Sequence, residues 1–253
     1  MHALVERGVY MKILIIRHGD PDYSIDSLTK QGWIEAECLS EKLVKMDIKA
    51  IYSSTLGRAK DTASVTLRKL GREPDGVYEW LKEFPPTIVK PNEKEADVCW
   101  DWLPADWTVE DRFYDREKWS AVPIMSQNHV REEYDRVTGE FDKLIAKHGY
   151  VREGNYYRAE NPNMDTIAIF CHFGLGCVLI SHLLGISPMP LWHGLCAAPS
   201  SVSTLTTEER RDGIAYFRMS SYGDVSHLYA KGEESSFSAR FCEMYQNKNE
   251  RHD

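Results

Sequence analysis

The chain has 253 residues, a formal net charge of −8, 42% hydrophobic residues and 28% charged residues. These values are typical of a globular protein, and the acidic balance argues against general binding to nucleic acid or to anionic membranes. No apolar run approaches the roughly 20 residues that a membrane-spanning helix needs. An anionic substrate would therefore have to be attracted by local arginines against the overall field.

The six cysteines are scattered along the chain without a CxxC pair: Cys38, Cys99, Cys171, Cys177, Cys196 and Cys242. A disulfide framework is not expected in a chain of this length, so reduced thiols and a cytoplasmic location fit better. The N-terminus has no signal-peptide pattern. We expect Met1–Tyr10 to be a leader, with Met11 as an alternative start.

The first strong pattern is an aliphatic run, Ile13–Ile16, that stops at an arginine, a histidine and a glycine. Such a run predicts a strand buried on both faces, as in a parallel sheet. A buried strand delivers Arg17 and His18 to the carboxyl edge of the sheet, where open α/β folds bind ligands. Gly19 allows the backbone to turn sharply there. A strand that ends in an ordinary polar pair stays open as an alternative.

The polar segment 20–27 predicts a loop. A helix is expected after it, with Thr29 as its candidate N-cap, and Ile48–Ser53 predicts a second short strand. We expect Thr55 to cap the helix that follows, Leu56–Leu70.

Arg58 falls in the first turn of that second helix. Its guanidinium would lie near exposed N–H groups and the positive end of the helix dipole, which is an unfavourable place for a cation. A solvated surface arginine is the simpler interpretation. We favour an anion that lies between Arg58 and the helix terminus.

Val77–Leu81 predicts a third strand, which Glu83 follows. From Pro85 to about Gln127 the periodic pattern breaks down, and this segment carries four tryptophans among acidic residues and prolines. It is too long for a simple connection and too aromatic for disorder, so we interpret residues 85–127 as a Trp-rich insertion that packs over the domain. Both a lid and a filling between elements are consistent with its composition.

The opening pattern recurs later in the chain. After an amphipathic helix at His129–His148 and a polar loop, Thr166–Cys171 predicts another buried strand. This strand ends at His172, and Gly174 leads into an apolar helix.

Two late strands, Val202–Thr206 and Ile214–Met219, are expected to form a hairpin, and the tail after Gly232 is expected to be polar and exposed. The length suits one large α/β domain or two small ones, and the buried aliphatic strands are of the kind found in parallel sheets. Because the sequence has no internal repeat and no linker-like segment, we expect residues 1–253 to form a single domain.

Four side chains fall at or just beyond the carboxyl ends of predicted strands: Arg17, His18, Arg58 and His172. In an open sheet these ends line one rim, so the four side chains can converge. Two arginines can hold a phosphate group, one imidazole can attack phosphorus, and the other can stabilise charge on the transferring oxygens. A protonated carboxyl group is then needed for the leaving alkoxide, and Glu83 is the best-placed candidate.

Five segments between about residue 12 and residue 219 carry a resemblance: Leu14–Gly19, Leu28–Gly32, Tyr52–Ala59, Leu81–Glu83 and Phe170–Gly174. Together they resemble the histidine phosphatase superfamily, the phosphoglycerate mutase-like group of phosphatases and mutases. The resemblance implies a three-layer αβα sandwich with a mostly parallel central sheet. It also implies a phosphohistidine nucleophile, a phosphate pocket and a proton donor, with no metal and no cofactor. The residues implied are His18 as nucleophile, Arg17, Arg58 and His172 as the pocket, and Glu83 as donor.

The loop after the first strand departs from the family pattern. Many members carry a Ser/Thr or Glu-Thr and a Trp-Asn pair there, whereas this chain has Asp20–Ser24. The departure favours hydrolysis over a mutase reaction, and the carboxylates of Asp20 and Asp22 disfavour a highly anionic substrate and are alternative acids to Glu83. Candidate pocket residues are Asp20, Ser24 and His193, although a structural role is the simpler interpretation of His193.

The sequence therefore predicts a cytoplasmic enzyme that hydrolyses a small phosphate monoester through a phosphohistidine on His18. A phosphoglycerate mutase-type phosphotransferase and a non-catalytic phospho-ligand-binding module on the same fold stay open. So does a metal-dependent hydrolase that uses His18, Asp20, Asp22 and His172, although the two arginines would repel a metal cation. No nucleic-acid or membrane partner is expected, and a homodimer stays open.

Overall fold

The computed structural model describes residues 10–236 and residue 246, and its centre is an eight-stranded sheet in the order β5-β4-β10-β1-β11-β12-β9-β8. The strands are β1 (Lys12–Arg17), β4 (Ile48–Ser54), β5 (Gly76–Tyr78), β8 (Tyr150–Glu153), β9 (Tyr156–Ala159), β10 (Thr166–Cys171), β11 (Val202–Arg211) and β12 (Ile214–Asp224). The four strands β5, β4, β10 and β1 pair in parallel, and β12 and β8 run in the same direction. Only β11 and β9 of this sheet run the other way, so the predicted mostly parallel α/β sheet is confirmed.

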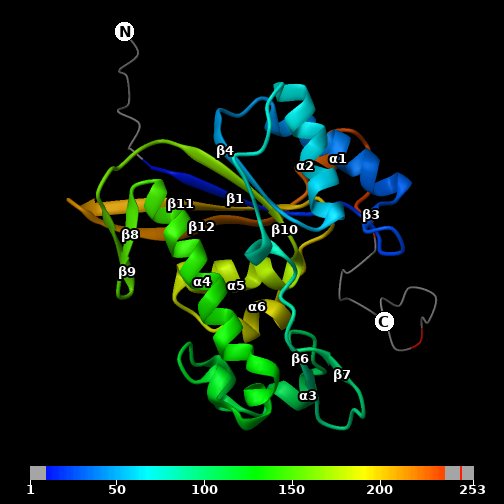
Figure 1. The fold of residues 1–253 in the computed structure, drawn as a ribbon, viewed down its shortest axis with the longest axis vertical. Helices are drawn as coiled ribbons and strands as arrows, with labels where there is room; N and C mark the ends of the chain where they lie inside the picture. The colour runs from blue at the N-terminus through cyan, green and yellow to red at the C-terminus, as the bar shows by residue number, and fades with distance from the viewer. Residues whose placement is uncertain (1–9, 237–245, 247–253) are drawn as a thin grey trace.

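Helices cover both faces of the sheet (Figure 1). On one face lie α1 (Lys30–Leu43) and α2 (Gly57–Leu70), and on the other α4 (Val130–Lys147), α5 (Phe173–Leu184) and α6 (Met189–Gly194). The strand β1 shows why: Leu14 and Ile16 pack in the core under α1 and α2, while Ile13 and Ile15 pack in the core under α4 and α5. Each such burial stabilises the fold by about 1.5–3 kcal/mol.

The first helix begins where the sequence predicts. Thr29 is its N-cap, and the Thr29 hydroxyl accepts a hydrogen bond from the Gly32 N–H at 3.1 Å. At Gly32 a Cβ atom would lie 2.2 Å from the Asp20 carbonyl oxygen, so only glycine lets α1 approach the loop after β1 this closely. That loop also contains a two-residue strand pair, β2 (Pro21–Asp22) with β3 (Ser27–Leu28).

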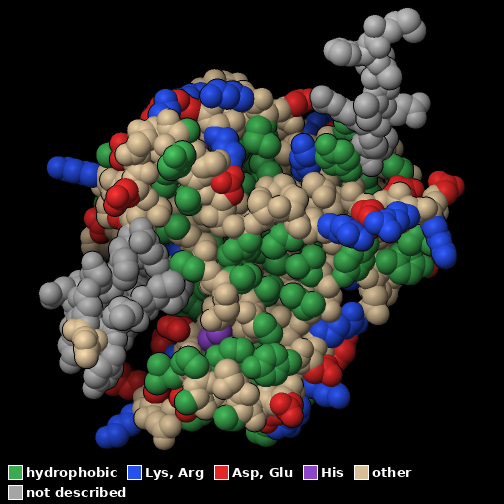
Figure 2. Space-filling view, turned by 180° about the vertical axis from the view of Figure 1, so that it is seen from behind, with side chains coloured by type: hydrophobic (Ala, Val, Ile, Leu, Met, Phe, Trp, Pro, Cys, Tyr) green, Lys and Arg blue, Asp and Glu red, His purple; other side chains and the backbone are tan. Residues whose placement is uncertain are grey.

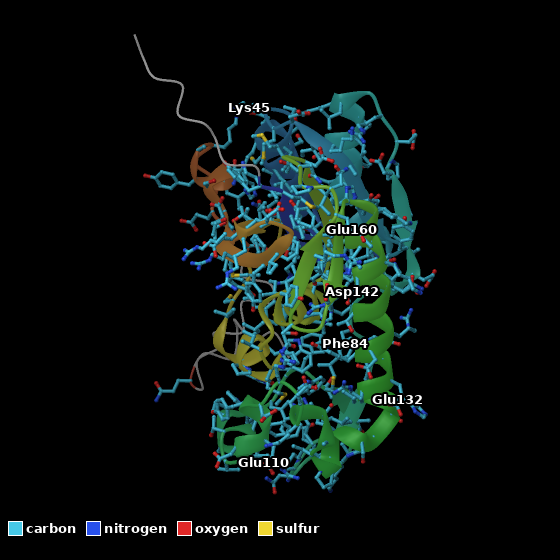
Figure 3. All side chains as sticks on the ribbon, turned by 90° about the vertical axis from the view of Figure 1, so that its left-hand side faces the viewer. Lys45, Phe84, Glu110, Glu132, Asp142 and Glu160 are labelled. Atoms are coloured by element: carbon cyan, nitrogen blue, oxygen red, sulfur yellow. The ribbon has the colours of Figure 1, made fainter. Side chains whose placement is uncertain are left out.

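The Trp-rich insertion forms a set of short elements: β6 (Thr87–Val89), β7 (Ala96–Val98), α3 (Pro104–Trp107) and 3-10 helices at Asp111–Tyr114, Trp119–Ala121 and Pro123–His129. Trp102, Trp107 and Trp119 are buried in the same core cluster as α4 and α5. The insertion extends one end of the molecule, and Figure 3 shows Glu110 at the opposite end from Lys45. Three of the four tryptophans therefore fill space between elements, while Trp100 is only partly buried. The number of domains stays a prediction.

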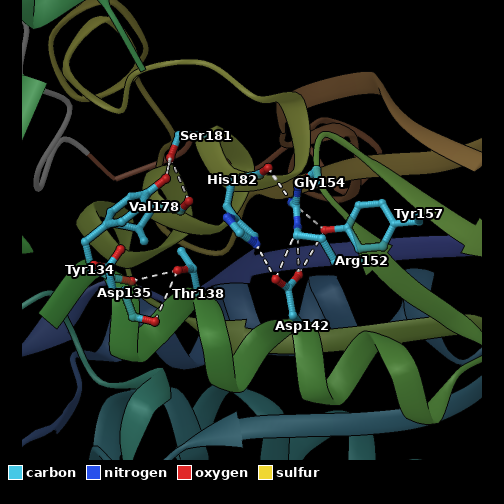
Figure 4. A network of polar contacts seen from close by, with 10 residues as sticks. All are labelled: Tyr134, Asp135, Thr138, Asp142, Arg152, Gly154, Tyr157, Val178, Ser181 and His182. Carbon is cyan, nitrogen blue, oxygen red and sulfur yellow. Dashed lines mark hydrogen bonds and ion pairs between the residues drawn. The ribbon is translucent and has the colours of Figure 1, made fainter. Parts of the chain in front are cut away.

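A polar cluster ties α4 and α5 to the β8–β9 hairpin (Figure 4). The Asp142 carboxylate lies 3.1 Å from Arg152 and 2.9 Å from His182, and it accepts a hydrogen bond from the Tyr157 hydroxyl at 3.1 Å. Burial alone would raise the pKa of Asp142, but contacts with His182 and Arg152 outweigh burial and lower it. The carboxylate is therefore ionised and structural.

Two element predictions need correction. The strand predicted at Val77–Leu81 is shorter, because after β5 the chain turns into a 3-10 helix, Glu79–Leu81. The polar loop predicted after α4 contains the hairpin β8–β9, whose two-residue turn places Gly154 at φ 60°. The Gly-Asn turn between two Tyr-containing runs was the signal for it.

The helix predicted at His129–His148 is confirmed as α4, and the late hairpin is confirmed as β11–β12 with longer strands. The last short helix, α7 (Ser226–Tyr229), follows that hairpin. The expected leader, apart from Tyr10, and most of the predicted tail lie outside the described residues. Within residues 10–236, no helix combines the length and the apolar character needed to cross a membrane.

Apolar side chains gather across the middle of one face of the molecule, while lysines, arginines and carboxylates lie mostly towards its edges (Figure 2). The carboxyl ends of β1, β4 and β10 meet at one edge of the sheet because the three strands pair in parallel. This edge carries the site described next.

Candidate active site

The end of β1 is held on both sides by backbone hydrogen bonds. The Arg17 N–H donates to the Ser201 carbonyl at 3.1 Å, and the His18 N–H donates to the Cys171 carbonyl at 3.0 Å. One residue further on, the Gly19 N–H donates to the Thr62 hydroxyl of α2 at 2.9 Å. The backbone that carries Arg17 and His18 is therefore fixed to β10, to α2 and to the loop before β11.

The tautomer of His18 follows from its hydrogen bond. Its Nδ1 lies 2.7 Å from the Gly19 carbonyl oxygen, and a carbonyl can only accept, so Nδ1 carries the proton. Nε2 is left with its lone pair. Burial, the charge of Arg17 and the charge of Arg58 hold the pKa of His18 well below its ordinary value, against the hydrogen bond to Gly19. At neutral pH the imidazole is therefore uncharged, with a lone pair on Nε2 that can act as a nucleophile.

His172 lies beside it at the end of β10, with the two imidazole centroids 5.1 Å apart. Its Nε2 lies 2.9 Å from the Ser54 hydroxyl oxygen, and that oxygen also accepts the Leu56 N–H at 3.2 Å. If the Ser54 hydroxyl donates to Nε2, both groups are satisfied and Nδ1 carries the proton. This Nδ1 is buried without a partner in the described part of the chain. It can then donate to an anion beside His18.

Burial lowers the pKa of His172 well below its ordinary value, and His18, Arg58 and Arg17 lower it further. His172 is also the N-cap residue of α5. A neutral imidazole that donates an N–H at a helix N-terminus suits a bound anion.

Each of the two arginines donates a hydrogen bond that helps to fix its guanidinium. The Arg17 Nη1 donates to the Ala197 carbonyl at 2.6 Å, and its guanidinium carbon lies 5.7 Å from the centre of the Phe173 ring. The Arg58 Nη1 donates to the Asp26 carboxylate at 2.7 Å. Both side chains therefore enter the site in fixed orientations.

The expected cap of α2 is wrong. The N-cap residue is Leu56, with no capping side chain, and the Asp26 carboxylate accepts the Gly57 N–H at 2.6 Å instead. The anion expected between Arg58 and the helix terminus is therefore a carboxylate of the chain itself. Asp26 lies 31 residues before Gly57, so no local capping pattern announces it.

Glu83 caps the N-terminus of α5 in the same way, with a carboxyl group from elsewhere in the chain. Its Oε1 accepts the Phe84 N–H and the Leu175 N–H, both at 2.9 Å. A Cβ atom on Gly174 would lie 2.9 Å from this oxygen, so the glycine makes room for the carboxyl group. Burial raises the pKa of Glu83, although the two amide hydrogen bonds and the charges of Arg17 and Arg58 oppose the rise.

The structure thus brings together Arg17, His18, Arg58, Glu83 and His172, which act electrostatically on one another. It does not bring the three candidate pocket residues into this group. The Asp20 carboxylate accepts hydrogen bonds from the Thr29 hydroxyl at 2.6 Å and the Ser236 hydroxyl at 2.9 Å. Ser24 donates to the Asp22 carboxylate at 2.6 Å, in an exposed turn.

His193 holds the Trp-rich insertion. Its Nε2 accepts the Trp102 N–H at 3.1 Å, its Nδ1 lies 2.7 Å from the Met189 carbonyl oxygen, and its ring stacks on Trp107. Burial lowers the pKa of His193 to about 4. Both ring nitrogens are engaged away from the group around His18.

Sequence reasoning missed Asp26 and Ser54. Each acts through a residue that the motifs already name, and each is a common polar residue in a loop or at a strand end. Among the described residues, no group of three or more histidine, cysteine, aspartate or glutamate side chains is arranged to hold a metal ion.

Solved structures share this fold. A phosphoserine phosphatase mutant from Entamoeba histolytica, in complex with phosphoserine, matches with a TM-score of 0.56 and 20% identity, over 86% of this chain and 99% of that chain. A mycobacterial glucosyl-3-phosphoglycerate phosphatase matches with a TM-score of 0.53 and 18% identity, over 85% of this chain and 99% of that one. At these identities the likeness establishes the fold alone.

No curated protein sequence matches the chain significantly. The family model of the histidine phosphatase superfamily (branch 1) matches residues 13–219, which include all five segments that carry the resemblance in the sequence. The expectation drawn from those segments is confirmed: the chain belongs to the histidine phosphatase superfamily.

Proposed function

We propose that the protein is a phosphatase that hydrolyses small phosphate monoesters through a phosphohistidine on His18. The observation that carries the proposal is the hydrogen bond from His18 Nδ1 to the Gly19 carbonyl, which leaves the lone pair on Nε2. Burial and the charges of Arg17 and Arg58 keep the imidazole neutral. A neutral nucleophile that lies in the field of two cations fits an anionic phosphate.

In the first step, His18 Nε2 attacks phosphorus and the bond from phosphorus to the leaving oxygen breaks. The guanidiniums of Arg17 and Arg58 and the Nδ1–H of His172 bind the phosphoryl oxygens as charge develops. The proton of Glu83 passes to the leaving oxygen, so the product is a neutral alcohol.

In the second step, water attacks phosphorus and the bond to Nε2 breaks. The Glu83 carboxylate takes a proton from this water, which restores the acid and releases inorganic phosphate. Burial raises the pKa of Glu83 and so favours the protonated form that the first step needs.

Solved relatives agree with a small phosphorylated substrate. The phosphatase from Entamoeba histolytica was solved with phosphoserine and also with 3-phosphoglyceric acid. We propose the same broad class for this chain, together with a cytoplasmic location. Buried free thiols at Cys38, Cys99, Cys171 and Cys177 support a reducing compartment.

The alternatives are less well supported by the geometry. A metal site would need Asp20 and Asp22, whose carboxylates bind Thr29, Ser236 and Ser24 instead. A module that only binds phospho-ligands would have no need for a buried carboxyl group with a raised pKa beside the nucleophile.

The test is release of inorganic phosphate from p-nitrophenyl phosphate by the wild type and by His18→Ala. We expect kcat to fall by at least about a thousandfold, because the variant lacks the imidazole on which the covalent intermediate forms. Labelled phosphate should be trapped on the wild type and not on the variant. Equal rates in the two proteins contradict the assignment of His18, and the His193→Gln variant, altered far from Nε2, is the control for general damage.

A further inference from the structure

A short loop before β11, residues 197–201, binds Arg17 at both of its ends. The Ala197 carbonyl accepts a hydrogen bond from the Arg17 Nη1 at 2.6 Å. The Ser201 carbonyl accepts the Arg17 backbone N–H at 3.1 Å. Both Ala197 and Ser201 are buried, so the fold encloses these contacts. The position of the 197–201 loop therefore helps to set where the Arg17 guanidinium lies.

The same loop contains a strained residue. Ser200 has φ 60°, in the left-handed region that a residue with a Cβ atom rarely adopts. Its N–H donates to the His18 carbonyl at 2.9 Å, so the strained residue is the one that the loop places against the proposed nucleophile. Among the described residues, five residues other than glycine have positive φ, and Ser200 is the only buried one; the others are Asp26, Asn92, Asn128 and His129.

The short helix α7 supplies the side chain that holds Ser200. His227 Nε2 lies 3.0 Å from the Ser200 hydroxyl oxygen, and both side chains are buried. Burial lowers the pKa of His227 to about 4, so its imidazole is uncharged at neutral pH. The hydrogen bond therefore joins two neutral groups that lie 27 residues apart in the chain.

The residues just before His227 are attached to α1. Lys42 of α1 forms an ion pair with Asp224, and its Nζ donates to the Ser226 hydroxyl at 3.0 Å. The Ser226 N–H donates to the Asp224 carboxylate at 2.8 Å. These contacts fix the start of α7, so His227 can hold the 197–201 loop against a firm support.

This arrangement lowers stability in two ways. Ser200 carries backbone strain, and the Nδ1 of His227 is buried without a hydrogen-bond partner in the described part of the chain. Unfavourable features of this kind gather at functional sites, where a required geometry outweighs stability. Here one feature lies one hydrogen bond from His18 and the other lies two hydrogen bonds from it.

We propose that His227 is a positioning residue: it holds Ser200 in its left-handed conformation, and the 197–201 loop thereby places Arg17 and His18 for phosphoryl transfer. The inference rests on the roles that the proposed phosphatase function gives to Arg17 and His18. His227 acts through Ser200, and it lies outside the five segments that carry the family resemblance.

The test compares His227→Leu with His227→Gln, whose side-chain amide can replace the imidazole as a hydrogen-bond partner of Ser200. His227→Leu should lower kcat for p-nitrophenyl phosphate, per active site, about tenfold and raise the inhibition constant of inorganic phosphate about fivefold, because Arg17 and His18 shift. His227→Gln should stay within about twofold of the wild type in both constants. A merely structural role would lower the amount of active enzyme, counted as trapped phosphoenzyme, and leave the inhibition constant unchanged.

Substitutions of Ser200 separate the strain from the loss of the hydroxyl. Ser200→Ala removes the hydroxyl and keeps the Cβ atom, so it should behave like His227→Leu. Ser200→Gly removes the same hydroxyl but adopts a positive φ without strain, so both constants should stay within about twofold of the wild type. For the same reason, Ser200→Gly should restore both constants in the His227→Leu background. If His227→Leu does not fold, the contrast between Ser200→Ala and Ser200→Gly decides in its place.

His182→Leu is the matched control, because it removes another partly buried histidine, which contacts Asp142 instead of the 197–201 loop. It should lower the Tm and leave the inhibition constant of phosphate unchanged. If the wild type hydrolyses no p-nitrophenyl phosphate, the phosphatase function is wrong. If the wild type is active but His227→Leu changes neither constant, or Ser200→Gly does not restore them, the phosphatase function stands and His227 does not position the site.

Discussion

The N-termini of α2 and α5 lie at the candidate site, and each is capped by a carboxyl group from elsewhere in the chain. At α2 the Asp26 carboxylate accepts the Gly57 N–H and holds Arg58. At α5 the Glu83 carboxyl group accepts the Leu175 N–H beside His172. Neither helix has a capping side chain of its own. The two ends are therefore built alike, with a carboxyl group at the helix terminus and a proposed phosphate-binding residue next to it.

Their acids differ in protonation. Burial would raise the pKa of Asp26, but the Gly57 N–H and the bound arginine outweigh it and lower that pKa. Burial raises the pKa of Glu83, and its amide hydrogen bonds and the arginine charges do not cancel the rise. The deeper burial of Glu83, together with the contact of Asp26 with the Gly57 N–H and with a guanidinium, separates a group that can carry a proton from a fixed anion. This difference supports the proposal that Asp26 positions Arg58 and that Glu83 is the acid.

Among the variants that test this comparison of the two helix ends, Glu83→Gln has the largest expected effect. Glu83→Gln should lower kcat for ethyl phosphate by about a hundredfold or more, because the leaving alkoxide loses its proton source. The rate of enzyme phosphorylation by p-nitrophenyl phosphate should change little, since that leaving group needs no proton. The measurement is single-turnover kinetics on both substrates, with Glu79→Gln, an exposed glutamate one turn earlier, as control.

The pH dependence of kcat/KM tests the proposed role of Glu83 independently. Glu83 must be protonated in the free enzyme, so kcat/KM for ethyl phosphate should fall as pH rises through its raised pKa. The lowered pKa of His18 keeps the nucleophile neutral over that range. In Glu83→Gln the alkaline decline should disappear. A variant that keeps the decline would move the role of acid to another group.

The next effect tests the positioning carboxylate. Asp26→Asn should raise KM and the inhibition constant of inorganic phosphate about tenfold together, because Arg58 loses its charged anchor. Loss of the cap should also cost about 1 kcal/mol of stability. Asp22→Asn is the matched control, because Asp22 lies in the same loop and its carboxylate accepts hydrogen bonds from Ser24 instead of holding an arginine. If the variant loses stability but its inhibition constant for phosphate is unchanged, Asp26 caps α2 and does not position Arg58 for phosphate binding.

The sequence predicted the parts of this site that are contiguous in the chain. Arg17 and His18 follow an aliphatic run, and His172 follows another, so local pattern places both at the sheet edge. Asp26 and Ser54 reach the pocket through contacts between segments, and Glu83 meets α5 from 92 residues away. Long-range side-chain contacts of this kind leave no periodic signal, which is also why Thr55 was mistaken for the cap of α2.

The same limit explains why the structure does not bring Asp20 and Ser24 into the group around His18. Asp20 and Ser24 are close to His18 in sequence, but a glycine turn separates them from it and tight packing against Gly32 directs Asp20 to Thr29. Proximity in the chain is therefore a poor guide just after a sharp turn. Strand ends are a better guide because the sheet fixes their direction.

The smallest expected effect concerns the residue that joins the two helix ends. The Ser54 hydroxyl oxygen accepts the Leu56 N–H at the start of α2 and lies against His172 Nε2 at the start of α5. In Ser54→Ala, Nε2 loses its partner, and the tautomer with the proton on Nε2 becomes populated at the expense of the Nδ1–H donor. We expect kcat to fall about three- to tenfold, because one charge-stabilising hydrogen bond is weakened rather than removed.

Ser53→Ala is the matched control for that change. Ser53 is the neighbouring buried serine, and its hydroxyl donates only to the Ser54 carbonyl at 3.1 Å. Both variants lose one buried hydroxyl, so a general packing effect should lower kcat equally in the two. A loss of kcat confined to Ser54→Ala would show that Ser54, which contacts both helix N-termini, sets the tautomer of His172. Equal losses in the two variants would mean that His172 keeps its tautomer without Ser54.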